Sequence, residues 1–248
     1  MIIIKTPDEI RKMRESGRIA ARVRDELAAL VAPGVTTREL DRKAATLIES
    51  FGAKSAFLGY HGYPGTVCIS IDAEVVHGIP GDRRIEMGEI VSLDIGVVYD
   101  GFVGDTATTV MVGVTDPDVV RLVRSTEQAL VAGVAMARAG KRLGDLSHAI
   151  EEVAVRAGFS VVRDFVGHGI GRKMHEDPQI PNFGTPGRGP KLKVGMTLAI
   201  EPMVNLGGGA VKVLPDGWTV RTADGKPSAH FEHTVVIGED GPEILTAV

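Results

Sequence analysis

The spacing of apolar and polar residues along the chain predicts the same order of elements twice. An amphipathic helix is expected from about Pro7, with Thr6 as its cap, and another from about Pro117, with Asp116 as its cap. Each is followed by a second helical segment and then by strand-like apolar runs. The pattern therefore predicts two successive units, each made of two helices followed by strands.

The second helical segments of the two units resemble each other in detail. "GVTTRELDRKAATLIESFG", in which Thr36 and Glu39 form a capping box, matches "GKRLGDLSHAIEEVAVRAG", and both segments end on a glycine. The strand runs match as well: "GEIVSLDIG" aligns with "GMTLAIEPM", which aligns Asp94 with Glu201. The chain therefore carries an internal repeat.

This repeat predicts the fold class and the domain organisation. Two equivalent units of helices followed by strands indicate an α+β fold with pseudo-twofold symmetry. Residues 6–113 and 114–248 would form the two halves of a single domain that spans 1–248. We expect a functional site where the halves meet, because symmetry-related side chains converge there.

The segment "SLDIGVVYDGFVGDTATT" predicts a β-hairpin with two misplaced charges. Asp100-Gly101 favours a two-residue turn. That turn would place Asp94 opposite Ala107, with Asp105 nearby on the same face. Two carboxylates in these positions repel each other unless they are protonated or bound to a cation. The ordinary alternative is that both aspartates flank the turn and point into solvent.

Three further polar residues interrupt apolar or glycine-rich stretches. His168 lies in "VGHGIGRKMH", between glycines that would let the backbone approach a ligand closely. Glu201 closes the apolar run "MTLAIEPM", and Glu232 enters the apolar strand of "AHFEHTVVIG". Their ordinary alternatives are a hydrogen-bonded loop histidine, a strand-end charge and a charged edge-strand residue. Four carboxylates that interrupt apolar strands, two of them related by the repeat, favour a shared site instead.

The residue types in this set indicate metal chemistry. Four carboxylates and one imidazole are mainly oxygen ligands with one nitrogen, which suits Mn²⁺, Fe²⁺, Co²⁺ or Zn²⁺. Two divalent ions would balance the four negative charges and leave room for a bridging hydroxide. Paired metals of this kind activate water for hydrolysis. The residues alone therefore predict a metal-assisted hydrolase.

Composition excludes several other classes of protein. The formal net charge of −4 gives no support for nucleic-acid binding. The apolar runs are too short to span a membrane, and the first residues lack a signal-peptide pattern. The only cysteine, Cys68, excludes an intramolecular disulfide framework and fits a reducing compartment. We expect a soluble cytoplasmic protein, by default a monomer, with neither nucleic acid nor membrane as a partner.

With these motifs in order, the chain resembles type I methionine aminopeptidases over essentially its full length. The matching stretches are "GYHGYPGTVCISIDAEVVHGIP", "VSLDIGVVYDGFVGDTATT", "GHGIGRKMHEDPQIPNF", "LAIEPM" and "HFEHTVVI". The resemblance implies the pita-bread fold, with two ααβ halves and a curved, mostly antiparallel sheet covered by helices. It also implies removal of the initiator methionine from nascent polypeptides near the ribosome, with a preference for a small second residue.

The resemblance also implies a role for each candidate metal ligand. It implies that Asp94 chelates one of two divalent ions and that His168 and Glu201 hold the other. Asp105 and Glu232 would bridge the two ions. A hydroxide held between them would attack the first peptide carbonyl, with Glu201 as the proton shuttle.

The substrate site follows from the same resemblance. His77 and His175 are expected to hydrogen-bond the scissile amide and to stabilise the tetrahedral oxyanion. The methionine pocket would be lined by Tyr60, Tyr63, Cys68, Met174 and Trp218. Sulfur–aromatic contacts suit a thioether, although ordinary core packing is the alternative for these aromatic residues. Met174 stands where the family often has phenylalanine, and Phe57 stands where the family varies.

Two other functions stay open. An Xaa-Pro aminopeptidase or prolidase-like enzyme shares the fold and a similar ligand set, although such enzymes usually carry an additional N-terminal domain for which this chain has no room. A non-catalytic pita-bread module that binds peptides would be expected to have lost ligands, whereas all five are present. We expect neither an N-terminal ribosome-docking extension nor the insertion of type II enzymes.

Overall fold

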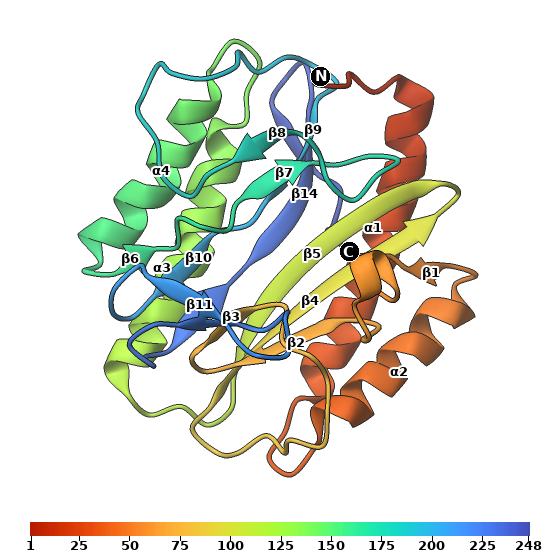
Figure 1. Ribbon diagram of the computed structural model, residues 1–248. Coiled ribbons are helices and arrows are strands. Elements are labelled where there is room, and N and C mark those ends of the chain that lie inside the picture. Colours follow the sequence, from red (N-terminus) through yellow and green to blue (C-terminus); the bar gives the residue numbers. More distant parts are fainter.

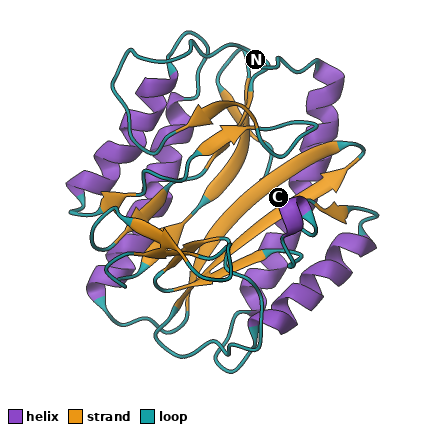
Figure 2. Ribbon diagram, viewed as in Figure 1, coloured by secondary structure: helices purple, strands orange, loops and turns teal.

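Two pairs of helices flank a curved antiparallel sheet in the computed structural model, which describes residues 1–248 (Figure 1). The helices are α1 (Pro7–Leu30), α2 (Thr37–Ser50), α3 (Pro117–Met136) and α4 (Leu143–Arg156), with a short 3₁₀ helix η1 (Tyr60–Gly62). In Figure 2 the two pairs lie on opposite sides of the strands. None of these helices combines the length and the apolar character that a membrane span requires.

The predicted helix starts are confirmed. The hydroxyl of Thr6 accepts a hydrogen bond from the backbone N–H of Glu9, whose carboxylate accepts from the backbone N–H of Thr6. Thr36 and Glu39 make the same capping box at α2. The carboxylate of Asp116 accepts from the second residue of α3 at 2.8 Å. Each such cap contributes about 1 kcal/mol by satisfying donors that have no partner inside the helix.

All nine strands of the main sheet pair antiparallel, in the order β1-β4-β5-β14-β9-β7-β8, with β2 beside β4 and β15 beside β14. Their bounds are β1 (Lys54–Ser55), β2 (Cys68–Ile71), β4 (Ile90–Tyr99), β5 (Phe102–Met111), β7 (Gly167–Gly169), β8 (Glu176–Ile180), β9 (Thr197–Ile200), β14 (Glu232–Ile237) and β15 (Pro242–Ile244). Two three-stranded sheets complete the fold. They are β13 (Ser228–His230), β10 (Met203–Asn205) and β6 (Ser160–Val161), and β11 (Val211–Val213), β12 (Val220–Thr222) and β3 (Glu74–Val76).

The β4–β5 hairpin is confirmed in its predicted register. Asp100 and Gly101 connect the strands with φ values of 47° and 77°, both positive, as a tight turn that matches the strand twist requires. Asp94 lies opposite Ala107. Because side chains alternate between the faces of a strand, Asp105 shares the face of Ala107 and hence of Asp94.

The hydrophobic core follows the two halves. One cluster packs α1 and α2 against β2 and β4, with Leu27, Leu40 and Leu93 at its centre. A second packs α3 and α4 against β9 and β14, around Leu122 and Leu198. Strand β14 of the second half pairs with β5 of the first, so the main sheet continues across the junction. The α+β class with two related halves is therefore confirmed, and the strands that meet at the junction carry the polar residues described next.

Candidate active site

Five neighbouring strands bring the predicted metal ligands into one pocket at the junction of the halves. Asp94 lies on β4, Asp105 on β5 and His168 in the middle of β7, while Glu232 begins β14 and Glu201 directly follows β9. The pocket is lined by 14 residues, which include every residue that the sequence predicted for the metal centre and for the substrate site. The remaining two are Phe57 and Val76.

The ligand atoms converge at distances suited to a shared cation. His168 Nε2 lies 3.5 Å from Glu201 Oε1 and 4.0 Å from Asp105 Oδ2. Asp105, His168 and Glu232 each offer one ligand atom, and these three atoms lie within 4.8 Å of one another. Asp94, Asp105, His168 and Glu232 are all buried. This combination of carboxylate oxygens and one imidazole nitrogen fits a divalent metal ion.

The acidic residues of this cluster lack the partners that buried charges need. Asp94 Oδ1, Asp105 Oδ1 and Glu232 Oε1 are buried without any hydrogen bond. Burial raises the pKa of Asp94, Glu201 and Glu232 well above their ordinary values, and the charge of Asp105 adds to each effect. Burial also raises the pKa of Asp105 to about 7. Such a cluster requires either protons or cations at neutral pH, and the donor set fits cations.

His168 is oriented for metal coordination. Its Nδ1–H donates to the carbonyl oxygen of Gly169 at 2.9 Å, which leaves the Nε2 lone pair directed at the carboxylates. Burial lowers the pKa of His168 to about 3, and the neighbouring His175 adds to this effect. The ring is therefore neutral at physiological pH, which is the form that binds metals.

Two threonine hydroxyls flank the short paired segment of β5 and β14, one joining β14 to β5 and the other joining β5 to the last residue of β13. The hydroxyl of Thr234 accepts from the backbone N–H of Asp105 at 3.0 Å and donates to its carbonyl oxygen at 2.8 Å. The hydroxyl of Thr109 makes the same two contacts with His230, at 3.0 and 2.7 Å. Between these two double contacts, Glu232 pairs with β5 in the regular ladder. The backbone positions of the two proposed bridging carboxylates are thus fixed by hydrogen bonds.

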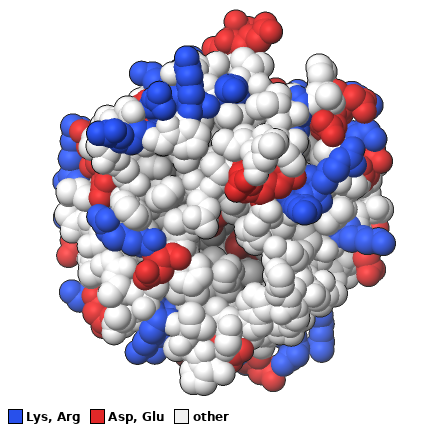
Figure 3. Space-filling view, turned by 45° about the horizontal axis from the view of Figure 1, so that its top comes forward, with Lys and Arg blue, Asp and Glu red and all other residues white.

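Beside the acids, the pocket forms a small aromatic cup. The rings of Tyr63 and Trp218 meet edge-on with centroids 5.1 Å apart, and the hydroxyl of Tyr63 donates to Gly78 at 2.8 Å. The cavity measures about 100 Å³, room for a few water molecules or one side chain. In Figure 3 a hollow opens near the centre of the face, with acidic atoms deep between uncharged walls.

The shape of this cup requires glycine at position 96. A Cβ atom there would lie 2.5 Å from the ring of Phe57 and 2.8 Å from Met174 Cε. Met174 lines the cup, and it is the residue at which the sequence alone did not define the shape of the pocket.

Two further histidines, His77 and His175, line the pocket. His175 Nδ1 lies 2.8 Å from the hydroxyl of Tyr60, and its ring centroid is 4.4 Å from that of His168. His77 lies edge-on to Trp218, with centroids 6.3 Å apart. Burial lowers the pKa of His77 to about 4, so its ring is neutral at physiological pH.

The glycines around His168 have a packing role that the sequence did not indicate. The sequence predicted that they let the backbone approach a ligand closely, and the structure places Gly167 and Gly169 in strand β7. A Cβ on Gly167 would lie 2.4 Å from the carbonyl oxygen of Ala199 on β9, and one on Gly169 would lie 2.0 Å from that of Asp177 on β8. These glycines therefore allow the neighbouring strands to approach β7, which brings His168 to the acids of β5 and β14.

His230 is the polar residue at the site that the sequence analysis missed. Its side chain is 1% exposed, and its Nε2 lies 3.6 Å from Glu201 Oε2. Burial lowers the pKa of His230 to about 3, with a smaller contribution from His77. A signal was present in "AHFEH": alternate residues of an extended chain share a face, and Glu232 is two residues further on.

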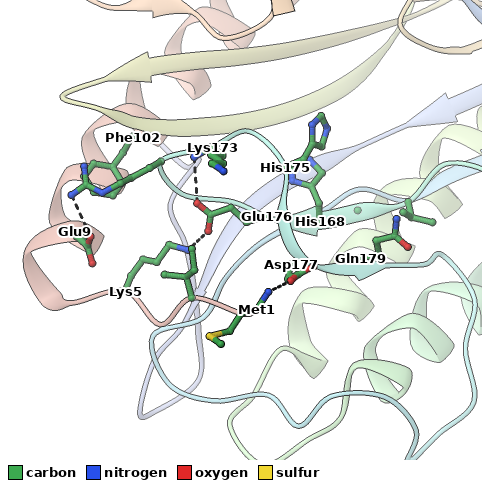
Figure 4. Close-up of a pocket in the computed structure, with 14 residues that line it drawn as sticks. Met1, Lys5, Glu9, Phe102, His168, Lys173, His175, Glu176, Asp177 and Gln179 are labelled. Atoms are coloured by element: carbon green, nitrogen blue, oxygen red, sulfur yellow. Dashed lines mark hydrogen bonds and ion pairs between the residues drawn. The ribbon is translucent and has the colours of Figure 1, made fainter. Parts of the chain in front are cut away.

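A larger cavity of about 670 Å³ adjoins the site on the other side of His168 and His175 (Figure 4). Most of its charged groups are already paired with one another, with Lys173 the exception. Lys5 contacts Glu176, the amino group of Met1 contacts Asp177, and Glu9 contacts Arg172 at 3.4 Å. The unpaired buried carboxylates, which are the candidate metal ligands, belong to the smaller pocket.

Comparisons with known proteins agree with this geometry. The model of metallopeptidase family M24 matches residues 11–239. The chain is 52% identical to a methionine aminopeptidase of Clostridium perfringens and 51% identical to methionine aminopeptidase 1 of Bacillus subtilis, in both cases over all of both chains. A crystal structure of a methionine aminopeptidase from Thermotoga maritima superposes with a TM-score of 0.99, at 48% identity and with complete coverage of both chains.

Proposed function

The chain belongs to metallopeptidase family M24, and from this premise we propose that it hydrolyses the first peptide bond of polypeptides to release the N-terminal methionine. Its α+β fold is the pita-bread fold of that family. The observation that carries the proposal is the single pocket in which unpaired buried carboxylates adjoin an aromatic cup. Use of a divalent metal follows from the family and from the cluster of Asp105, His168 and Glu232.

We assign two metal ions to this pocket. Asp94 would hold one, His168 and Glu201 the other, and Asp105 and Glu232 would lie between them. Two divalent ions neutralise the four carboxylates, whose buried oxygens otherwise lack partners. When bound, the ions lower the pKa of water and polarise the peptide carbonyl. Co²⁺, Mn²⁺, Fe²⁺ and Zn²⁺ all suit the donor set.

The side chains of the pocket would carry the proton and orient the peptide. Glu201 accepts the proton of the attacking water on a carboxylate oxygen and delivers it to the departing amine. If the hydroxyl of Tyr60 donates to Nδ1 of His175, the Nε2–H of His175 is free to donate to the substrate carbonyl. His77, beside Trp218, would donate to the same peptide group.

The substrate's methionine would occupy the cup of Tyr63, Cys68, Met174 and Trp218, where a thioether meets aromatic rings. The resemblance to type I methionine aminopeptidases supports a preference for a small second residue in the substrate. We further propose that the chain acts as a monomer, because one chain supplies every wall of the pocket. Its substrates would be nascent chains in the cytoplasm, met near the ribosome, where N-termini first appear.

A metal-reconstitution assay tests this function. The purified protein is stripped of metal, reloaded with one metal at a time and offered the peptides Met-Ala-Ser and Ala-Pro-Ala. We expect free methionine from the first peptide, only when metal is present. Cleavage that depends on proline would instead indicate an Xaa-Pro peptidase, and inactivity with every metal would indicate a binding module. The control variant Asp94→Asn lacks one proposed metal ligand. It should lower both the amount of bound metal and the rate of turnover.

A further inference from the structure

His230 is a buried histidine to which the proposed mechanism gives no task. It ends strand β13, and neither of its ring nitrogens has a hydrogen-bond partner. A buried polar group without a partner is unfavourable by about 1–3 kcal/mol. The imidazole therefore needs a contact that the site itself supplies.

The contact available to His230 is Glu201. His230 Nε2 lies 3.6 Å from Glu201 Oε2, while His168 Nε2 lies 3.5 Å from Glu201 Oε1. The Glu201 carboxylate thus lies between two imidazoles, one beside each oxygen. These two rings come from different strands, β7 and β13, and so approach the carboxylate independently.

The backbone of His230 is held in place for this contact. The hydroxyl of Thr109 accepts from its N–H and donates to its carbonyl oxygen. That hydroxyl also lies 2.9 Å from Ser92 Oγ on the adjacent strand β4. The position of the imidazole is therefore set by the central strands of the main sheet.

We propose that His230 is a positioning residue whose Nε2–H donates to Glu201 Oε2 and holds that carboxylate with Oε1 toward His168. The inference rests on the proposed function, since it concerns the carboxylate that carries the proton. A neutral imidazole has one N–H, and an adjacent carboxylate selects the tautomer that carries it on Nε2. A separation of 3.6 Å is longer than a formed hydrogen bond. We expect it to shorten when substrate binds, as catalytic hydrogen bonds often do.

The test compares His230→Leu with His230→Gln in the metal-loaded enzyme. The leucine variant removes the donor, and loss of an outer hydrogen-bond partner of this kind lowers activity about 10- to 100-fold. We expect that loss in kcat for Met-Ala-Ser, with KM and the bound metal at saturation unchanged. The glutamine variant keeps an N–H at similar reach and should recover most of kcat. His233→Leu is the matched control, because His233 bonds Thr246 on the opposite face of the sheet.

A spectroscopic measurement tests the contact without turnover. In zinc-loaded protein with ¹⁵N-labelled histidines, we expect the His230 ring to carry its proton on Nε2, and we expect that signal to shift in Glu201→Gln. A proton on Nδ1, wild-type kcat in His230→Leu, or loss of metal from that variant would each overturn the proposal. Failure of the wild type to release methionine with any metal would instead count against the proposed function, and the NMR result would still report on the contact.

Discussion

The substitution Asp105→Asn should change the stability of the protein in opposite directions with and without metal. In metal-free protein the buried Asp105 carboxyl has a pKa of about 7 against an ordinary 3.8, because burial disfavours its charged form. At about 1.4 kcal/mol per pKa unit, ionising this group in the folded protein is unfavourable by about 4 kcal/mol.

The direction in which pH changes folding stability depends on whether the folded or the unfolded state binds the proton more tightly. A group with a raised folded-state pKa favours folding fully below its unfolded pKa, and this contribution is lost as the pH rises through the folded value. The metal-free wild type should therefore lose up to about 4 kcal/mol relative to Asp105→Asn between pH 4 and pH 8. Titrations of the buried histidines are common to both proteins, whereas those of Asp94, Glu201 and Glu232 are not, because the charge of Asp105 raises the pKa of each and so adds to the loss in the wild type.

Metal reverses this order. Asparagine cannot supply the carboxylate that we propose lies between the two ions, so the variant should bind metal more weakly. A ligand that binds only the folded state adds about 4 kcal/mol at a thousandfold excess over its dissociation constant, so the two proposed ions would add about 8 kcal/mol to the wild type, more than it loses at pH 8 without metal. With excess Mn²⁺ at pH 8, the wild type should therefore be the more stable protein.

Urea unfolding measures both effects. Wild type and Asp105→Asn are unfolded between pH 4 and pH 8, once with a chelator and once with excess Mn²⁺. Asp240→Asn, at an exposed loop carboxylate, is the control and should leave stability unchanged within about 0.5 kcal/mol. If Asp105→Asn destabilises the chelated protein at pH 8, burial of the ionised Asp105 carboxylate is not unfavourable as described.

Three further substitutions test other parts of the site. Thr234→Val should lower metal affinity about 10- to 100-fold by removing both hydrogen bonds to the backbone of Asp105, and Thr234→Ser should restore it in a metal titration. Gly96→Ala should push Met174 into the cup and raise KM for methionyl peptides severalfold, with metal content unchanged by elemental analysis. His175→Ala should bind the full complement of metal while kcat falls about 10²- to 10³-fold, because it removes the proposed hydrogen bond to the reacting peptide and no proposed metal ligand.

Local rules account for the features that the sequence predicted correctly. The Asp100-Gly101 turn defines the register of β4 and β5 by itself, because a two-residue hairpin turn leaves no freedom in the pairing. Helix caps are equally local, because Thr6 and Thr36 each pair with a glutamate in the first turn of the helix that follows. Carboxylates in apolar strands were visible as candidates because water is the usual partner of such groups, and a strand core excludes it.

The contacts between distant strands could not be predicted from these rules. The double contact of Thr234 with Asp105 joins residues 129 positions apart, and it depends on the register between β5 and β14. That register is set by packing of the two halves, and a shift of one residue would turn Thr234 to the other face. The packing role of the glycines beside His168 could not be predicted for the same reason, since the strands they accommodate lie elsewhere in the sequence.

The internal repeat also explains how two equivalent acids come to have different tasks. Asp94 and Glu201 align in the repeat, and burial raises the pKa of both. Asp94 Oδ1 has no hydrogen-bonding partner, so only a cation or a proton can satisfy it. Glu201 instead has an imidazole beside each oxygen, His168 at 3.5 Å and His230 at 3.6 Å. A carboxylate held in this way can keep one oxygen toward a metal ion while the other takes up and releases a proton. We infer that the histidines of the second half assign the proton to Glu201 and leave Asp94 as a ligand only.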